Sequence, residues 1–309
     1  MTRLANRIAY GEALVELGRR DPKVVVLDAD LAKATQTDRF RQAFPERFFN
    51  AGIAEQNLMG LAAGMAATGL IPFVSTFAVF ATMRGVEQFR NSIAYPNLNV
   101  KVVATHAGIE NGPDGASHQS VEDLAIMRAI PNTTVIVPSD PITTKKAVEA
   151  VAQTYGPAYI RLGRAEMPFL YAEDFQFEIG KGAQLRDGYD LTIIAVGNMV
   201  EKALLAADEL AKERIRARVI DLLTVKPLDE ELILKAAQET RGIITVENHS
   251  ILGGLGGAIC ELLSERYPAR VLRVGLQDRF GGCGNPELLH EELGLSVDSI
   301  IAAAHRLLK

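Results

Sequence analysis

Cysteine is scarce in this sequence, with Cys260 and Cys283 as the two examples among 309 residues. Two cysteines are too few for a disulfide framework, and they are not spaced as a metal site. An excess of one charge is missing as well, because 33 Lys and Arg stand against 38 Asp and Glu, a net charge of −5. This balance gives no indication of a nucleic-acid-binding face. The composition, 48 % hydrophobic and 23 % charged, excludes the disordered, collagen-like and coiled-coil classes.

An uninterrupted apolar run long enough for a membrane span is also missing. The uncharged stretch 58–83 exceeds the roughly 20 residues that a spanning helix needs. However, glycines, Pro72 and Ser/Thr residues interrupt it, so we interpret it as buried core. The first residues, MTRLANRIAYGEAL, carry charge too early for a secretory signal peptide. These features predict a cytoplasmic protein that binds neither membrane nor nucleic acid.

Short β-branched runs alternate with helical stretches along the whole chain. The runs predict strands at 24–30, 70–77, 100–106, 133–139, 158–163, 191–197, 217–225, 242–248 and 271–276. Helices are predicted at 4–19, 55–67, 79–94, 121–129, 141–154, 199–213, 229–240, 254–266 and 297–308. Strands that are apolar nearly throughout are typical of parallel sheets covered on both faces. We therefore predict an α/β fold of two doubly wound domains, 1–165 and 181–309, joined by a linker at 166–180.

Two helix starts carry capping signals. Ser120 with Asp123 is similar to a capping box, and Ser139-Asp140-Pro141 places a cap before a first-turn proline. Ligands of doubly wound sheets collect at the carboxyl ends of the strands, which makes the polar residues there candidates for a site. These residues are Asp28, Asp30, His106, Arg161 and Arg164 in the first domain, and Asp221, Glu247 and His249 in the second.

Glu55 opens a predicted helix whose following turns hold no charge before Arg84. The carboxylate either stabilises the positive end of that helix, or it stands in an apolar wall and shares a proton with a ligand base. Phe77 and Phe80, at the change from strand to helix, fit core packing as well as a ligand surface. Arg161 and Arg164 fit a phosphate site or a surface salt bridge.

The loop THAGIENGPDGASHQSVEDL contains His106, Glu110, Asp114 and His118. A long loop with two histidines and several acids favours a substrate-binding role over a merely solvated loop. Zinc is the rival ligand, but the spacing of the histidines matches no zinc pattern, and we predict no metal held by this chain. The glycines of LGGLGGA do not have GxGxxG spacing, and no P-loop, nucleophile elbow or HExxH motif is present.

Taken together, these segments resemble the C-terminal half of transketolase, over essentially the whole chain. The family's GxxE motif stands here as Gly52-Ile53-Ala54-Glu55 and its STF-x-x-F segment as 75–80. The family's histidine loop appears as His106, then Asp114-Gly115, then His118-Gln119. The resemblance implies that the first domain binds the pyrimidine half of thiamine diphosphate and that the second is a transketolase C-terminal domain.

The resemblance also implies a role for each matching residue. Glu55 would hydrogen-bond the pyrimidine ring and so activate the cofactor, and Phe80 would stack on that ring. Glu55, His106 and His118 are the implied catalytic residues. Further implied cofactor contacts are Ile53, Phe77, Met83 and Asp30, and the implied substrate contacts are Asp114, Arg164, Arg7, His106 and His118. The family often has a serine at Ala34 and a tyrosine at Met83, so the corresponding contacts differ here.

The GDG…N motif, through which these enzymes bind the diphosphate and its cation, is absent from this sequence. The resemblance therefore implies a second polypeptide, an N-terminal transketolase subunit that holds the diphosphate and Mg²⁺ (or Ca²⁺). Two copies of each chain, a heterotetramer, would follow the family pattern.

The function implied is transfer of a two-carbon ketol unit from a ketose phosphate to an aldose phosphate, as in the pentose phosphate pathway. One alternative is the beta subunit of a 2-oxo acid dehydrogenase decarboxylating component, although the loop with His106 and His118 looks more like sugar-phosphate chemistry. A second is a 1-deoxyxylulose-5-phosphate synthase-like enzyme, normally one long chain. The third is a non-catalytic assembly partner, which would have no need of Glu55 or Phe80.

Overall fold

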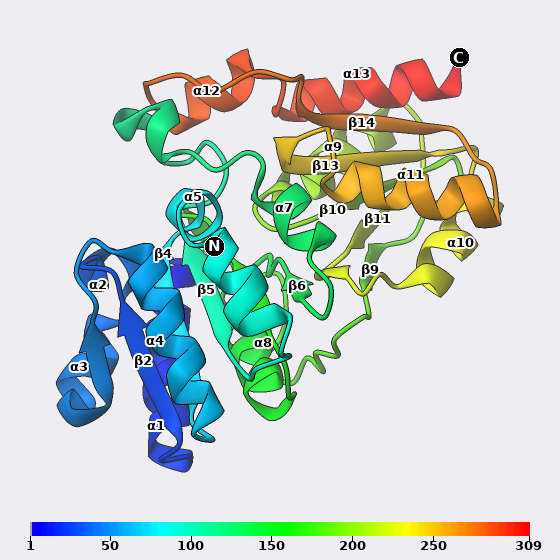
Figure 1. Ribbon diagram of the computed structural model, residues 1–309. Helices are drawn as coiled ribbons and strands as arrows, with labels where there is room; N and C mark the ends of the chain where they lie inside the picture. Colours follow the sequence, from blue (N-terminus) through cyan, green and yellow to red (C-terminus); the bar gives the residue numbers. More distant parts are fainter. Residues whose placement is uncertain (1) are drawn as a thin grey trace.

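The apolar runs of the sequence form two sheets in the computed structural model, which describes residues 2–309 (Figure 1). The first sheet has the strand order β12-β6-β7-β5-β4-β2-β3. Its strands are β2 (Val24–Asp28), β3 (Phe48–Asn50), β4 (Ile71–Phe77), β5 (Lys101–Thr105), β6 (Thr134–Ile136), β7 (Ala158–Arg161) and β12 (Thr224–Lys226). All neighbours are parallel except β12, which runs antiparallel to β6. Every residue of β2 and β5 is buried, because helices cover both faces.

Helices pack on both faces of this first sheet. They are α1 (Asn6–Arg20), α2 (Ala32–Thr35), α3 (Asp38–Ala43), α4 (Glu55–Ala67), α5 (Ala78–Met83), α6 (Val86–Gln88), α7 (Asp123–Ala129) and α8 (Pro141–Gln153). Leu14 of α1 and Val148 of α8 share one apolar cluster with the sheet. Leu58 of α4 and Leu124 of α7 belong to a different cluster, on the other face.

The second sheet has the order β14-β13-β10-β11-β9, with β9 antiparallel at one edge. Its strands are β9 (Ala183–Arg186), β10 (Leu191–Ala195), β11 (Ala217–Asp221), β13 (Ile243–Ser250) and β14 (Val271–Leu276). The surrounding helices are α9 (Met199–Lys212), α10 (Glu230–Glu239), α11 (Leu255–Arg266), α12 (Pro286–Glu292) and α13 (Val297–Leu308). Helices α9 and α13 pack on one face of this sheet, and α10 and α11 on the other.

The two halves of the chain share structure at their junction. Strand β12 belongs to the second half in sequence, yet it completes the edge of the first sheet beside β6. One apolar cluster contains Leu58 of the first half together with Ile194 and Ile259 of the second. In the predicted linker, β8 (Glu166–Pro168) pairs antiparallel with β1 (Arg3–Ala5). The domain boundaries at 165 and 181 therefore stay a prediction. The two halves share a sheet and an apolar cluster, so they are not joined by a linker alone.

The structure contains an element at each predicted strand and helix, but two of them are divided. The predicted strand 217–225 forms β11 and β12, which belong to different sheets. The stretch 79–94 forms α5, α6 and a π-helical turn (Phe89–Ala94) instead of one helix, and the breaks fall at Arg84 and Gly85. A Cβ at Gly85 would meet the Met59 side chain at 3.1 Å, so the chain passes close to α4 there and a larger residue would require Met59 to shift. Within residues 2–309, none of the helices combines the length and apolar character that crossing a membrane requires.

One of the two predicted helix caps is confirmed and one is wrong. The Asp140 side chain accepts a hydrogen bond from the backbone N–H of Thr143, which completes a capping box at the start of α8. The Ser120–Asp123 pair does not cap α7, and the Ser120 hydroxyl has no hydrogen-bond partner within the described residues. The Asp123 carboxylate is instead occupied by Arg161, whose charge competes more strongly than a backbone N–H.

A buried carboxyl joins both halves and the linker. Asp221, at the end of β11, accepts hydrogen bonds from the Ser139 hydroxyl and, at 2.8 Å, from the Tyr171 hydroxyl. Burial raises the pKa of Asp221 to about 7, against the lowering effect of these two donors. The folded protein therefore keeps this proton to about pH 7, whereas the unfolded chain releases it near pH 4. Because the folded state binds more protons in that window, the contribution of Asp221 to stability falls as the pH rises.

We expect Asp221→Asn to remove this pH dependence. From pH 5 to pH 8, Asp221 should lower the free energy of unfolding of the unchanged protein by about 2–4 kcal/mol, and the variant should not show this loss. Urea unfolding of both proteins at the two pH values measures the difference. Glu265→Gln, at an exposed position, serves as the control and should leave the difference near zero. Parallel stability curves for Asp221→Asn and the unchanged protein would contradict the prediction.

Candidate functional site

The carboxyl edge of the first sheet gathers most of the residues that the sequence singled out. Phe77 ends β4, His106 directly follows β5, and Arg164 follows β7. These strands are adjacent and parallel, so their carboxyl ends meet at one edge of the sheet. Glu55 is the first residue of α4 and comes shortly after the end of β3. The site is thus built on the ends of several strands and the start of one helix.

Two phenylalanines and two histidines stack at this edge. The ring of Phe77 lies 4.0 Å from the His106 ring and 5.7 Å from the Phe80 ring. His118 meets Phe80 edge-on, with 5.4 Å between the ring centres. Phe77 is buried and supports the stack from the core, whereas Phe80 is only partly buried. The stack therefore fixes Phe80 and both histidines relative to one another.

A buried carboxylate stands beside Phe80. Glu55 is 3 % exposed, and both of its carboxylate oxygens lie 3.3 Å from a guanidinium nitrogen of Arg84. The same guanidinium lies over the Phe80 ring, 4.3 Å from the ring centre, although half of the Arg84 side chain is exposed. Glu55 and Arg84 line a hollow of about 640 Å³ together with Ile53 and Met83, both of which are exposed. Arg84 thus occupies the space between the carboxylate and the aromatic ring.

Two arginines converge near His106. Arg7 donates a hydrogen bond to the backbone carbonyl of Ala34 at 2.9 Å, and its buried Nε has no partner within the described residues. Burial, followed by the charge of Arg164, lowers the pKa of Arg7. Burial and both arginine charges lower the pKa of His106 to about 3, so His106 is neutral at physiological pH. Arg7 and Arg164 are both cations, and no carboxylate lies close to Arg7. The pair therefore suits the binding of an anion.

The loop that carries His118 rests on the second half of the chain (Figure 1). The backbone N–H of Gly284 donates to the carbonyl of Gly112, and the thiol of Cys283 donates to the carbonyl of Pro113 at 3.1 Å. Asp114, on this loop, is exposed and lies 4.0 Å from the Arg164 guanidinium. The second half of the chain therefore shapes the site, although all residues with an implied cofactor or substrate role belong to the first half.

Asp30 and Arg161 have other partners. Asp30 follows β2, is exposed, and accepts a hydrogen bond from the Asn50 side-chain amide at 3.0 Å, outside the contacts that join the other site residues. Arg161 is buried in an ion pair with Asp123 at 2.7 Å and donates to the backbone carbonyl of Asn248 at 2.9 Å. Of the two interpretations of Arg161, the phosphate site is therefore wrong, and the salt bridge that it forms is buried instead of lying on the surface.

The polar strand ends of the second half hold the structure together. Glu247 accepts hydrogen bonds from the backbone N–H groups of Leu255 and Gly256, at 2.7 Å and 2.8 Å, and so stabilises the start of α11. The His249 side chain is buried, and its ring lies beside the backbone N–H of Ala125 in α7. Asp221 and His249 thus contact the first half of the chain, whereas Glu247 acts within the second half.

Sequence reasoning missed two residues of the site. Arg84 was noted only as the next charge after Glu55, and its contact with Phe80 has no signal in the spacing. Glu110 was recognised as a loop acid, but its buried position beneath Arg164 depends on the fold. Within residues 2–309, no group of three or more His, Cys, Asp or Glu side chains is arranged to hold a metal ion.

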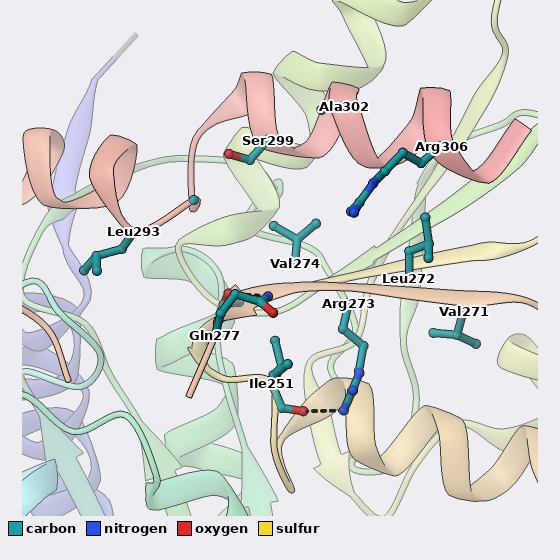
Figure 2. Close-up of a pocket in the computed structure, with 12 residues that line it drawn as sticks. Ile251, Val271, Leu272, Arg273, Val274, Gln277, Leu293, Ser299, Ala302 and Arg306 are labelled. Atoms are coloured by element: carbon teal, nitrogen blue, oxygen red, sulfur yellow. Dashed lines mark hydrogen bonds between the residues drawn. The ribbon is translucent and has the colours of Figure 1, made fainter. Parts of the chain in front are cut away.

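A second hollow, of about 610 Å³, lies in the second half between the edge strand β14 and α13 (Figure 2). Arg306 of α13 points into this hollow, whereas Arg273 turns away and donates to the backbone carbonyl of Ile251 at 2.8 Å. None of the residues predicted from the sequence to form the site lines it. The hollow is separate from the cluster around Glu55 and Phe80.

Comparisons with known proteins find the same two-domain organisation. Residues 2–168 match the pyrimidine binding domain of transketolase, and residues 180–300 match the transketolase C-terminal domain. A transketolase C-terminal section from Methanocaldococcus jannaschii is 51 % identical over 95 % of this chain and 93 % of its own length. A 6-deoxy-6-sulfo-D-fructose transketolase subunit from a Clostridium species is 44 % identical over 97 % of this chain and 93 % of its own length. A solved split-gene transketolase, an inactive beta4 tetramer, has a TM-score of 0.93 and 53 % identity over 99 % of this chain and 98 % of that one.

The chain belongs to the transketolase family and corresponds to its C-terminal section, with a pyrimidine-binding domain followed by a transketolase C-terminal domain. The predicted α/β fold of two domains is confirmed.

Proposed function

We propose that this chain is the C-terminal subunit of a thiamine-diphosphate-dependent transketolase and works only with an N-terminal partner subunit. The reaction is transfer of a two-carbon ketol unit from a ketose phosphate to an aldose phosphate. One observation carries the proposal: a buried carboxylate, a partly exposed phenylalanine, two histidines and two arginines share one edge of the sheet. Membership of the family supports it.

The hollow beside Glu55 fits the pyrimidine half of the cofactor. A buried carboxylate at one end suits a ring nitrogen with which it shares a proton, and Phe80 offers an aromatic plate next to it. Exposed Ile53 and Met83 supply apolar contact at the rim. When bound, thiamine diphosphate supplies the carbanion chemistry, while the protein supplies position and electrostatics.

The residues on the other side of Phe80 fit a sugar phosphate. Arg7 and Arg164 would hold the phosphate, because both carry charge into the same region. Neutral His106 can donate or accept a hydrogen bond at a sugar oxygen, and His118 stands across the stack from it. Asp114, exposed near Arg164, would contact the acceptor. A sulfonate would suit the same two guanidinium groups, and one relative is named for a sulfosugar.

A second polypeptide is part of the proposal because this chain offers only the pyrimidine side of the cofactor. The sequence has no GDG motif, and Ile53 and Met83 leave an apolar rim uncovered. The partner would hold the diphosphate with Mg²⁺ (or Ca²⁺), and two copies of each chain would form a heterotetramer. We propose a cytoplasmic location on the low cysteine content.

Reconstitution tests the proposed function. This chain is mixed with a candidate N-terminal transketolase chain, thiamine diphosphate and Mg²⁺, and cleavage of xylulose 5-phosphate is followed with an aldose phosphate as acceptor. Turnover that requires both chains supports the proposal, and a sulfonated ketose in place of the phosphate distinguishes the two anions. Consumption of pyruvate without sugar cleavage would favour the dehydrogenase or synthase alternative. Inactivity with every donor would favour an assembly role.

If the pyrimidine ring binds between Phe80 and Glu55, Arg84 would have to leave its place, because its guanidinium contacts both residues. We therefore expect Arg84→Ala to tighten binding of thiamine diphosphate to the two-chain complex about threefold to tenfold. That factor corresponds to the roughly 1 kcal/mol of an exposed ion pair or cation–π contact. Titration calorimetry measures the dissociation constant, with Arg84→Lys as a variant that keeps the charge and loses the planar group. Weaker binding by Arg84→Ala would show that Arg84 supports the cofactor instead of competing with it.

A further inference from the structure

The segment that carries Arg164 is held in place by a buried carboxylate. Glu110 is 4 % exposed, and one of its oxygens accepts hydrogen bonds from the backbone N–H groups of Arg164, at 2.6 Å, and Ala165, at 3.0 Å. A Cβ at Gly163 would lie 2.4 Å from the same carboxylate oxygen, so the absence of a side chain at Gly163 makes room for the carboxylate. No Lys or Arg forms an ion pair with Glu110 within residues 2–309. Hydrogen bonds, and not an ion pair, therefore hold the carboxylate in place.

The second half of the chain supplies the remaining contact of Glu110. Asn198, immediately before α9, donates a hydrogen bond from its side-chain amide to the other carboxylate oxygen. The side chain of Asn198 does not cap α9, although it stands at the N-cap position, so this polar group is used across the junction instead. Gly197 approaches the first half closely, since a Cβ there would lie 3.1 Å from the Val137 side chain. The residue before α9 is thus in direct contact with the Glu110 carboxylate.

A neighbouring contact reinforces this attachment. Arg3 donates to the backbone carbonyl of Glu166 at 2.9 Å and forms an ion pair with Glu201, in the first turn of α9, at 2.6 Å. The first turn of α9 therefore reaches the Arg164 segment by two routes, one buried and one exposed. The buried route through Glu110 is the stronger, because a buried hydrogen bond to a charged group is worth more than an exposed ion pair.

We propose that Glu110 and Asn198 are positioning residues for the phosphate-binding Arg164, through which the second domain sets the affinity of the site for the substrate phosphate. Neither residue touches substrate in this arrangement, and both act by fixing the backbone of residues 164 and 165. The inference rests on the proposed function, and it gives the transketolase C-terminal domain a role in substrate binding.

Steady-state kinetics of the two-chain complex with two donors tests the proposal. Asn198→Asp sets a carboxylate against Glu110, and we expect it to raise the KM for xylulose 5-phosphate about tenfold, the size of one lost hydrogen bond to a charged group. The kcat should stay within about twofold, and the KM for hydroxypyruvate, a ketol donor without phosphate, should not change. Glu209→Gln, an exposed position on the same helix, is the control.

A charge swap separates positioning from general damage. In the double variant Glu110→Gln with Asn198→Asp, the amide of residue 110 donates to the new carboxylate, so the bridge is restored with donor and acceptor exchanged. We expect the KM of the double variant to return most of the way to the value of the unchanged protein. Hydrogen exchange gives a readout independent of activity: the amides of Arg164 and Ala165 should exchange faster in Asn198→Asp and be protected again in the double variant.

The outcomes distinguish this inference from the proposed function. A wild-type complex that turns over neither donor rejects the proposed function and, with it, the phosphate role of Arg164. Two results would reject the positioning role alone, provided that the wild-type complex is active. One is that Asn198→Asp changes the KM equally for both donors, and the other is that amide exchange at residues 164 and 165 stays unchanged. Failure of the double variant to recover also counts against it.

Discussion

Replacing Glu55 with alanine should lower the turnover of the two-chain complex by about 100-fold or more, the range expected when acid–base assistance is lost. The carboxylate is buried at the start of α4 and is the acid that faces the hollow beside Phe80. Its removal takes away the group that would share a proton with the pyrimidine ring. Folding should be little affected, because the Arg84 partner left behind is half exposed and can hydrate.

The measurement is the turnover rate of the two-chain complex with one ketose donor at saturating thiamine diphosphate. Light scattering checks that the complex forms. Glu87→Ala is the matched control, since Glu87 lies on α6 and contacts its surface neighbours Gln88 and Asn91. Near wild-type turnover of Glu55→Ala in an intact complex would remove Glu55 from the proposed role.

Replacing Asp123 with alanine should destabilise the protein by about 3–5 kcal/mol, the usual effect of removing one partner of a buried ion pair. Asp123 is fully buried, and Arg161, 2.7 Å away, is 6 % exposed. The Tyr159 hydroxyl, which donates to Asp123 at 2.8 Å, would lose its acceptor as well. An uncompensated guanidinium would remain at the contact with Asn248 of the second half.

The control is a second ion pair with the same distance between its charged atoms but with an exposed carboxylate. Arg128 and Glu261 also approach to 2.7 Å, but Glu261 is 66 % exposed. Glu261→Ala should therefore cost no more than about 1 kcal/mol. Urea unfolding of the two variants, followed by circular dichroism, gives both values, and equal losses would contradict the role assigned to burial.

The sequence predicts long, strongly apolar elements better than short ones. The run VVVLD forms β2 as predicted because every one of its residues is buried between helices. The three-residue strands β1 and β8 have no periodicity of their own, and they exist because they pair with each other. Strand β12 was predicted as the end of a longer strand at 217–225, but it leaves the second sheet to join β6. Such pairing depends on tertiary contacts that local patterns do not contain.

The same distinction applies to the site. His106 and Arg164 were placed correctly at strand ends, because parallel topology brings those ends together. Their assigned roles stay predictions. The hydrogen bond between Glu110 and Asn198 joins residues 88 positions apart, and the contact of Arg84 with Phe80 depends on a side-chain direction. Neither could be obtained from composition or spacing.

The pairing of β12 with the first sheet has a consequence for unfolding. A fragment cut after residue 180 would lose the strand that closes the β6 edge, and it would expose its side of the apolar cluster that includes Ile194 and Ile259. Open strand edges next to bare apolar surface favour aggregation. The two halves should therefore melt in a single cooperative transition, and neither is a candidate for independent expression.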